Sequence, residues 1–154
     1  MYLVAYPEER LVAPEKRNEA IVGGTETILV VEDEEALRNL LTELLESYGY
    51  TVLKADDGVS GLEQFKRHRE DIEAVITDMG LPRMSGQDLF TRIRELDPSS
   101  RIVLASGYLD PGLRSHLMAL GAKAFLQKPY QPTDILRVIR GVIDAGAQTE
   151  RGVP

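Results

Sequence analysis

The sequence predicts an α/β fold, a doubly wound five-stranded parallel sheet with helices on both faces. Short apolar runs rich in β-branched residues alternate along the chain with segments whose apolar residues recur every three or four positions. Most of these runs are four or five residues long, as expected for strands that are buried on both faces. The 154 residues are 43% hydrophobic, which suffices for one domain with a substantial core.

The expected strands are apolar segments separated by helical patterns. They are Ile28–Val31, Thr51–Ala55, Ala74–Thr77, Arg101–Ala105 and Ala124–Leu126. Right-handed crossovers leave few topologies for such repeats, and the flavodoxin-like strand order 2-1-3-4-5 is the expected one. In such a sheet the functional crevice lies at the carboxyl ends of the strands, beside the first strand.

Helices are expected between the strands, because apolar stripes there are bounded by capping and stop signals. Ser85 and Asp88 form a capping-box-like pair at the start of the third helix. The fourth helix has the weakest pattern, although Asp110 and Pro111 suit its first turn. The expected helices run from Leu37 to Gly49, from Gly58 past Phe65, from Ser85 to Asp97, from Asp110 to Gly121, and from Pro132 to about Asp144.

Composition argues against several kinds of protein and site. The chain contains no cysteine, which rules out disulfides and thiolate metal sites. His68 and His116 lie in helical patterns and are expected at the surface rather than as ligands. A net charge of −7 argues against broad binding to nucleic acid. The apolar runs are too short to cross a bilayer and no signal peptide is present, so we expect a cytoplasmic protein with no membrane insertion by this segment.

Polar residues that suit a metal and an oxyanion stand at the expected carboxyl ends of the strands. Glu32 and Asp33 follow the first strand, and Asp78 follows the third. Ser106 follows the fourth strand and Lys128 the fifth. Three converging carboxylates would repel one another without a cation, and all-oxygen ligation is what Mg²⁺ prefers. A lysine and a hydroxyl in the same crevice suit the oxygens of a phosphoryl group.

Each of these residues also has an ordinary structural interpretation. The acidic pair at Glu32 can simply favour the start of a helix, and Asp78 can be a loop residue before a turn. Ser106-Gly107 can be an ordinary turn, and Lys128-Pro129 an exposed loop. The functional interpretation is favoured because all four segments stand at carboxyl ends of strands, where the fold brings them together.

Four segments resemble the receiver domains of two-component signalling, and the resemblance covers residues 25–145. The segments are 28–34 (ILVVEDE), 75–86 (VITDMGLPRMSG), 103–108 (VLASGY) and 121–129 (GAKAFLQKP). The resemblance implies that Asp78 accepts a phosphoryl group from a phosphohistidine. It also implies that Asp33 ligates Mg²⁺, that Glu32 does so directly or through water, and that the backbone carbonyl of Gly80 is a further ligand. Mn²⁺ is expected to substitute for Mg²⁺.

The resemblance also implies a conformational switch. Lys128 would pair with the phosphoryl oxygens, and Ser106 would hydrogen-bond to them once they arrive. Phe125 occupies the aromatic switch position, and Pro129 is expected to follow a cis peptide bond. Position 80 is glycine where larger side chains are common in the family, which predicts an open site.

The expected function is Mg²⁺-dependent transfer of a phosphoryl group from phosphohistidine to Asp78, with the domain catalysing its own phosphorylation and dephosphorylation. The expected partners are a histidine kinase or a histidine phosphotransfer domain, and not nucleic acid. A homodimer is compatible with the apolar surface near the fourth helix.

Two alternative functions are a free-standing response regulator and a pseudo-receiver that only binds proteins. A flavodoxin-like cofactor binder is disfavoured because no glycine-rich phosphate loop follows the first strand.

Three regions are expected along the chain. Residues 1–24 form an N-terminal extension or linker, residues 25–145 the receiver domain, and residues 146–154 a C-terminal tail. The segment Met1–Pro7, the charged stretch that follows it and the Gly23-Gly24 pair resemble the connection into the C-terminal receiver of hybrid sensor histidine kinases. Ser106-Gly107-Tyr108 is also common in that group. The glycine pair is expected to be a flexible joint, and the extension to be dispensable for the chemistry.

Overall fold

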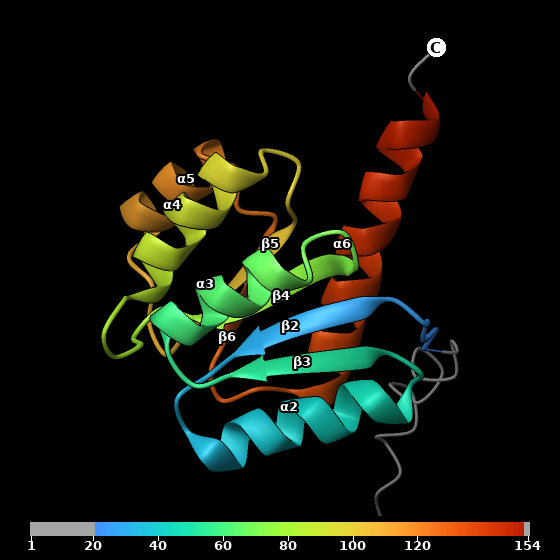
Figure 1. The fold of residues 1–154 in the computed structure, drawn as a ribbon, viewed down its shortest axis with the longest axis horizontal. Helices are drawn as coiled ribbons and strands as arrows, with labels where there is room; N and C mark the ends of the chain where they lie inside the picture. The colour runs from blue at the N-terminus through green and yellow to red at the C-terminus, as the bar shows by residue number, and fades with distance from the viewer. Residues whose placement is uncertain (1–20, 153–154) are drawn as a thin grey trace, which may run out of the picture.

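The computed structural model is a five-stranded parallel sheet with the order β3-β2-β4-β5-β6 (Figure 1). It describes residues 21–152, with side chains to residue 146. When these five strands are numbered 1 to 5 along the chain, their order across the sheet is 2-1-3-4-5. The predicted fold class and topology are therefore confirmed. The strands are β2 (Thr27–Val31), β3 (Thr51–Ala55), β4 (Ile72–Asp78), β5 (Ile102–Ser106) and β6 (Ala124–Gln127).

Helices cover both faces of the sheet (Figure 1). One core cluster joins the strands to the first and last helices, and the other joins them to the three helices between. Alternate residues of β2 divide between the two clusters, with Ile28 and Val30 in the first and Leu29 and Val31 in the second. The helices are α2 (Glu35–Ser47), α3 (Gly58–Arg67), α4 (Gly86–Leu96), α5 (Pro111–Ala119) and α6 (Pro132–Gly152).

The observed element bounds differ most from the expected ones at the last helix. We expected it to end near Asp144, where its apolar stripe ends, but α6 continues to Gly152. The added residues include alanine, glutamine and glutamate, which favour helix, and no proline occurs between residues 133 and 153. Most of the expected tail at residues 146–154 is therefore helical, and residues 153–154 lie outside the described residues.

Two helix starts show how the sequence sets their positions. The Ser85 hydroxyl accepts a hydrogen bond from the Asp88 N–H, as its place before α4 predicts. The complete capping box occurs instead at α3, where the side chains of Asp57 and Ser60 each accept a hydrogen bond from the backbone N–H of the other.

Among residues 21–152, no helix is both long and apolar enough to span a membrane.

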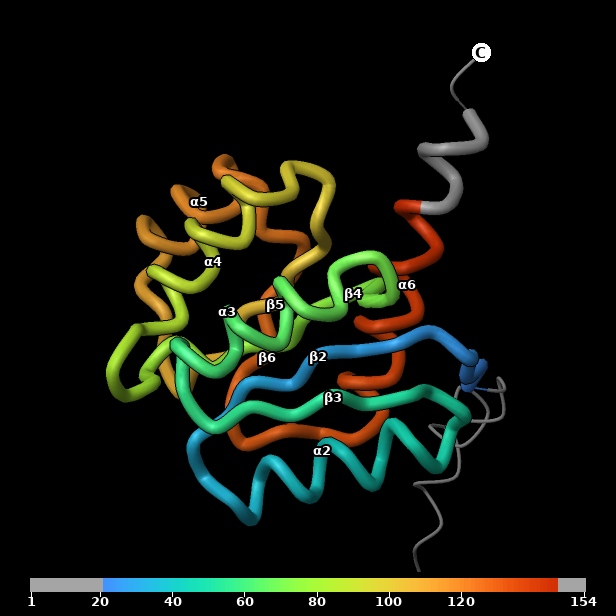
Figure 2. The backbone as a smooth tube through the Cα atoms, viewed as in Figure 1, coloured from blue at the N-terminus to red at the C-terminus, as the bar shows by residue number. Residues whose placement is uncertain are grey.

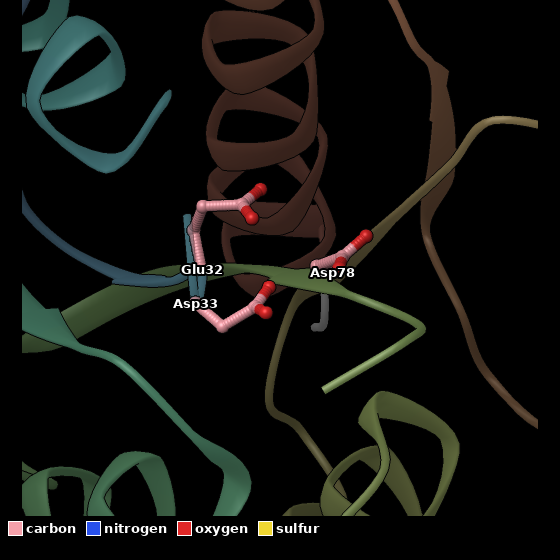
Figure 3. Close-up of side chains that lie close together, drawn as sticks. All are labelled: Glu32, Asp33 and Asp78. Atoms are coloured by element: carbon pink, nitrogen blue, oxygen red, sulfur yellow. The ribbon is translucent and has the colours of Figure 1, made fainter. Parts of the chain in front are cut away.

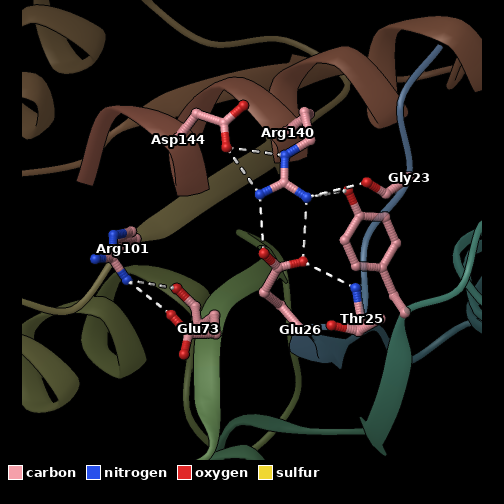
Figure 4. Close-up of polar contacts among 8 residues, drawn as sticks. Gly23, Thr25, Glu26, Glu73, Arg101, Arg140 and Asp144 are labelled. Atoms are coloured by element: carbon pink, nitrogen blue, oxygen red, sulfur yellow. Dashed lines mark hydrogen bonds and ion pairs between the residues drawn. The ribbon is translucent and has the colours of Figure 1, made fainter. Parts of the chain in front are cut away.

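Arg140 of α6 holds the chain just before β2 against the domain (Figure 4). Its guanidinium donates to the carbonyl of Gly23 at 3.1 Å and to both carboxylate oxygens of Glu26, at 3.1 and 2.9 Å. It also pairs with Asp144 one turn later and lies 3.5 Å from the hydroxyl of Tyr50. We call these five residues the Arg140 cluster. They tie the last helix to the start of the sheet.

The Gly23-Gly24 pair is packed closely. Gly24 donates its N–H to the carbonyl of Tyr48, which places this segment beside the turn between α2 and β3 (Figure 2). A Cβ atom at Gly24 would clash with the side chains of Glu26 and Arg140, so glycine permits the close approach. Both glycines use their backbone groups in tertiary hydrogen bonds, which differs from the expected flexible joint. Residues 1–20 of the expected extension lie outside the described residues.

Candidate functional site

Three carboxylates meet at the carboxyl edge of the sheet, as their places in the sequence predict (Figure 3). Glu32 and Asp33 follow β2, and Asp78 is the last residue of the neighbouring strand β4. Carboxylate oxygens of the three side chains lie within 4.8 Å of one another. The parallel register of β2 and β4 produces this convergence, because both strands end at the same level of the sheet.

The three carboxylates differ in exposure. Glu32 is 1% exposed and Asp78 8%, whereas Asp33 is exposed. Burial raises the pKa of Glu32, and the negative charge of Asp78 raises it further. The Glu34 N–H, which donates to Glu32 Oε2 at 3.2 Å, acts in the opposite direction. A buried carboxylate beside a second one needs positive charge nearby to remain ionised.

Lys128 supplies positive charge at this edge. Its Nζ lies 3.0 Å from Asp78 Oδ1 and 3.2 Å from Glu32 Oε1. Burial by itself would lower the pKa of Lys128, but the two carboxylates outweigh it and raise the pKa above its usual range. The peptide bond to Pro129 is cis, as expected. Lys128 therefore stays charged and contacts the two most buried carboxylates of the site.

Ser106 and Phe125 lie next to this site without joining the carboxylates. The Ser106 hydroxyl donates to the carbonyl of Tyr108 at 2.6 Å and accepts from its N–H at 3.3 Å. Phe125 of β6 is half-buried, and the guanidinium carbon of Arg114 lies 5.2 Å from the centre of its ring. Both side chains line a pocket of 220 Å³, whose lining residues are Ser106, Tyr108, Leu109, Arg114, Phe125, Leu126 and Gln127.

Two glycines shape the loop after Asp78. A Cβ atom at Gly80 would meet only Asp78 Oδ2, at 3.9 Å, so the space beside the carboxylate is open there, in agreement with the expectation for glycine at this position. A Cβ atom at Gly86 would clash with the carbonyl of Asp78. Glycine at the start of α4 therefore lets this helix begin directly against the end of β4.

Sequence analysis missed two residues that contact this site. Arg38 of α2 donates to the backbone carbonyl of Glu32 at 2.8 Å and holds the end of β2. The hydroxyl of Tyr130 donates to Glu32 Oε1 at 3.4 Å. Burial, followed by the negative charge of Glu32, raises the pKa of Tyr130, so its hydroxyl keeps the proton. Tyr130 follows Lys128-Pro129 directly, and that proximity in sequence was the available signal.

The arrangement suits a divalent cation and an oxyanion together. The Glu32, Asp33 and Asp78 side chains offer only oxygen ligands, which match Mg²⁺ better than a transition metal. Their convergence would be repulsive without a cation, and Lys128 neutralises one side of the cluster only. Asp78 Oδ2 faces the open space beside Gly80, where a further oxyanion has room.

Comparison with known proteins gives one consistent family. A family model described as the response regulator receiver domain matches residues 28–140. The chain is 29% identical over 116 residues to the chemotaxis protein CheY of Thermotoga maritima, covering 75% of this chain and 95% of that protein. It is 30% identical over 136 residues to the sensor kinase CckA of Brucella abortus, covering 87% of this chain. The match spans only 14% of the length of that kinase.

Solved structures agree with these relatives. A receiver domain protein from Clostridium thermocellum superposes with a TM-score of 0.76 at 31% identity, covering 80% of this chain and 98% of the other. A chain of the CheX–CheY–BeF3–Mg complex from Borrelia burgdorferi superposes with a TM-score of 0.73 at 27% identity, covering 76% and 88%.

Proposed function

This chain belongs to the response regulator receiver domains of two-component systems, and we propose that Asp78 is its phosphoacceptor in a Mg²⁺-dependent reaction. The observation that supports this most is the meeting of Glu32, Asp33 and Asp78 with Lys128 at one edge of the sheet. Mg²⁺, or Mn²⁺ in its place, would be held by these three carboxylates and the carbonyl of Gly80. The solved relative that contains BeF3 and Mg²⁺ supports the same chemistry.

The reaction is a transfer from nitrogen to oxygen. A carboxylate oxygen of Asp78 attacks the phosphorus of a phosphohistidine, the new O–P bond forms, and the N–P bond breaks with its electrons returning to the imidazole. When bound, Mg²⁺ neutralises charge on the phosphoryl oxygens. Lys128 already lies 3.0 Å from Asp78 Oδ1, so its ammonium can pair with an incoming phosphoryl oxygen. The open space at Gly80 admits the donor and water.

The donor is a histidine kinase or a histidine phosphotransfer domain. We propose that this chain is the receiver part of a hybrid sensor histidine kinase, which the similarity to a segment of the sensor kinase CckA supports. A free-standing response regulator is the alternative, supported by the match across nearly the whole of CheY. Both alternatives use the same site on this chain.

Ser106 and Phe125 would carry the response to phosphorylation. In the structure the Ser106 hydroxyl bonds to the backbone of Tyr108 rather than to Asp78. A phosphoryl group on Asp78 offers this hydroxyl a charged acceptor, which makes the stronger hydrogen bond. Movement of Ser106 toward it would enlarge the pocket beside Phe125 and let the ring shift.

The acceptor is tested with acetyl phosphate, Mg²⁺ and intact-mass measurement. Wild type should gain the mass of one phosphoryl group, and Asp78→Asn should gain none. Asp71→Asn is the matched control, because Asp71 is an exposed aspartate that precedes the same strand at its other end. Equal labelling of Asp78→Asn would remove the assignment. An unlabelled wild type would favour a pseudo-receiver that only binds proteins.

A further inference from the structure

Tyr130 connects the hydrophobic core to the acidic site. Its half-buried ring packs against the core cluster shared by α2, α6 and the sheet. Its hydroxyl lies 3.4 Å from Glu32 Oε1, and the Lys128 Nζ lies 5.9 Å from the centre of its ring. The ring therefore fixes the position of one neutral donor next to the most buried carboxylate of the site.

Glu32 has a partner on each carboxylate oxygen. Oε2 accepts the Glu34 N–H at 3.2 Å, whereas Oε1 is shared by the Lys128 ammonium at 3.2 Å and the Tyr130 hydroxyl at 3.4 Å. With 1% exposure, this side chain has almost no access to bulk water. Loss of a partner on Oε1 would leave a buried carboxylate oxygen unsatisfied, which is costly.

Lys128 is the partner that phosphorylation would draw away. The ammonium now pairs with Asp78 Oδ1 as well as with Glu32 Oε1. A phosphoryl group on Asp78 brings new anionic oxygens, and they attract the ammonium more strongly than one shared carboxylate oxygen does. The Tyr130 hydroxyl is carried by a ring that packs against the core, so it remains beside Glu32 Oε1.

We propose that Tyr130 is a positioning residue that keeps Glu32 Oε1 hydrogen-bonded when Lys128 turns to a phosphoryl oxygen on Asp78. This inference rests on the proposed phosphoacceptor function. It predicts that the hydroxyl matters little while Lys128 remains on Glu32 and matters more once a phosphoryl group is present. Tyr130 thereby stabilises the phosphorylated state without touching the phosphoryl group.

The test compares two affinities in Tyr130→Phe, which removes the hydroxyl and keeps the ring. The first is the affinity for Mg²⁺ alone, and the second is the affinity for beryllofluoride, a mimic of the phosphoryl group, at saturating Mg²⁺. Both are measured by titration of backbone amide shifts. Tyr48→Phe is the matched control, since Tyr48 is exposed at the other end of the sheet and loses the same hydroxyl.

Tyr130→Phe should change the Mg²⁺ dissociation constant by less than about twofold and weaken beryllofluoride binding about three- to tenfold, the effect of one hydrogen bond. Tyr48→Phe should change neither. Unchanged beryllofluoride binding in Tyr130→Phe would overturn the inference, as would an equal loss of both affinities, which indicates a general structural role. A wild type that fails to bind beryllofluoride would instead overturn the proposed function. A thermal melt establishes that each variant is folded.

Discussion

Asp33 occupies a different environment from the two carboxylates beside it. Lys128 contacts Glu32 and Asp78 inside the site, whereas Asp33 reaches the same cluster from the solvent side. A cation bound by all three carboxylates would also neutralise the charge of Asp33, which is not among the carboxylates that Lys128 contacts. Substitution of Asp33 should therefore weaken metal binding and leave the ion pairs of Lys128 with Glu32 and Asp78 in place.

We predict that Mg²⁺ stabilises the fold through this cluster. At a concentration ten times the dissociation constant, linkage adds about 1.4 kcal/mol to the free energy of unfolding. Asp33→Asn should remove most of that gain, and Asp71→Asn should retain it. Thermal or urea unfolding with and without Mg²⁺ provides the measurement. A wild-type unfolding transition that is the same with and without Mg²⁺ would contradict the metal site.

A second residue-scale prediction concerns pH. The hydrogen bonds from Arg140 lower the pKa of Glu26 below its usual value of 4.5. A carboxyl whose pKa is lowered by folding adds stability above its unfolded pKa, and that stability is lost as the pH falls through its folded pKa. Glu26→Gln should therefore destabilise the protein at pH 7, with a difference from wild type that shrinks below about pH 4.5.

Urea unfolding at several pH values measures this difference. Glu46→Gln, which alters an exposed glutamate of α2, is the control and should differ little from wild type at any pH. A pH-independent loss of stability in Glu26→Gln would show that the carboxylate charge is unimportant to the Arg140 cluster.

Among the elements, the end of β5 and the neighbouring strand β6 hold the proposed switch residues, Ser106 and Phe125. Ser106 ends β5 and bonds to the loop before α5, and the Gln127 side chain of β6 donates to the carbonyl of Gly107 in that loop at 3.3 Å. Movement of Ser106 would therefore disturb the loop, the start of α5 and the pocket beside Phe125 together.

Ser106→Ala should accept a phosphoryl group on Asp78 but pass little change to α5, because alanine offers no hydroxyl to the phosphoryl oxygens. Backbone amide shifts around α5, recorded with and without acetyl phosphate, measure the response. Ser47→Ala on α2 removes a hydroxyl far from the site and should respond like wild type. Matching shifts in Ser106→Ala and wild type would show that another residue transmits the change.

The regular elements were predictable because their signals are local. Strand β2 is a continuous apolar run, and its carboxyl end fixed Glu32 and Asp33 at the site. The end of α6 was missed because its apolar stripe stops near Asp144 while helix-favouring residues continue. Tyr130 was missed because a motif places its backbone at the site edge but does not set the direction of its side chain.

At the scale of the whole molecule, contacts between distant segments escaped sequence analysis. Glycine pairs usually indicate flexibility, yet Gly23 and Gly24 are held by Arg140 and Tyr48. The contact between Gly23 and Arg140 spans 117 residues, so no local pattern could reveal it. Ile21 also packs against the core, which extends the folded unit before the expected boundary at residue 25.

Truncation tests this extended boundary. A chain that begins at Ile21 should keep wild-type stability, whereas one that begins at Thr25 loses the packing of Ile21 and the hydrogen bonds of both glycines. We expect the shorter chain to lose roughly 1–3 kcal/mol of unfolding free energy. Both chains should label with acetyl phosphate, because the site lies elsewhere. Equal stability of the two chains would show that the contacts of residues 21–24 do not stabilise the fold and that Gly23-Gly24 acts as a flexible linker.

The Arg140 cluster also sets the geometry of a tether that enters this domain before β2. It anchors the preceding chain at the amino edge of the sheet, whereas Asp78 lies at the carboxyl edge. The five residues of β2 separate these edges by roughly 17 Å. A histidine donor on the same polypeptide must therefore have a connecting segment long enough to return along the sheet. A donor on a second molecule would approach Asp78 without that constraint, so a short tether would favour transfer between molecules.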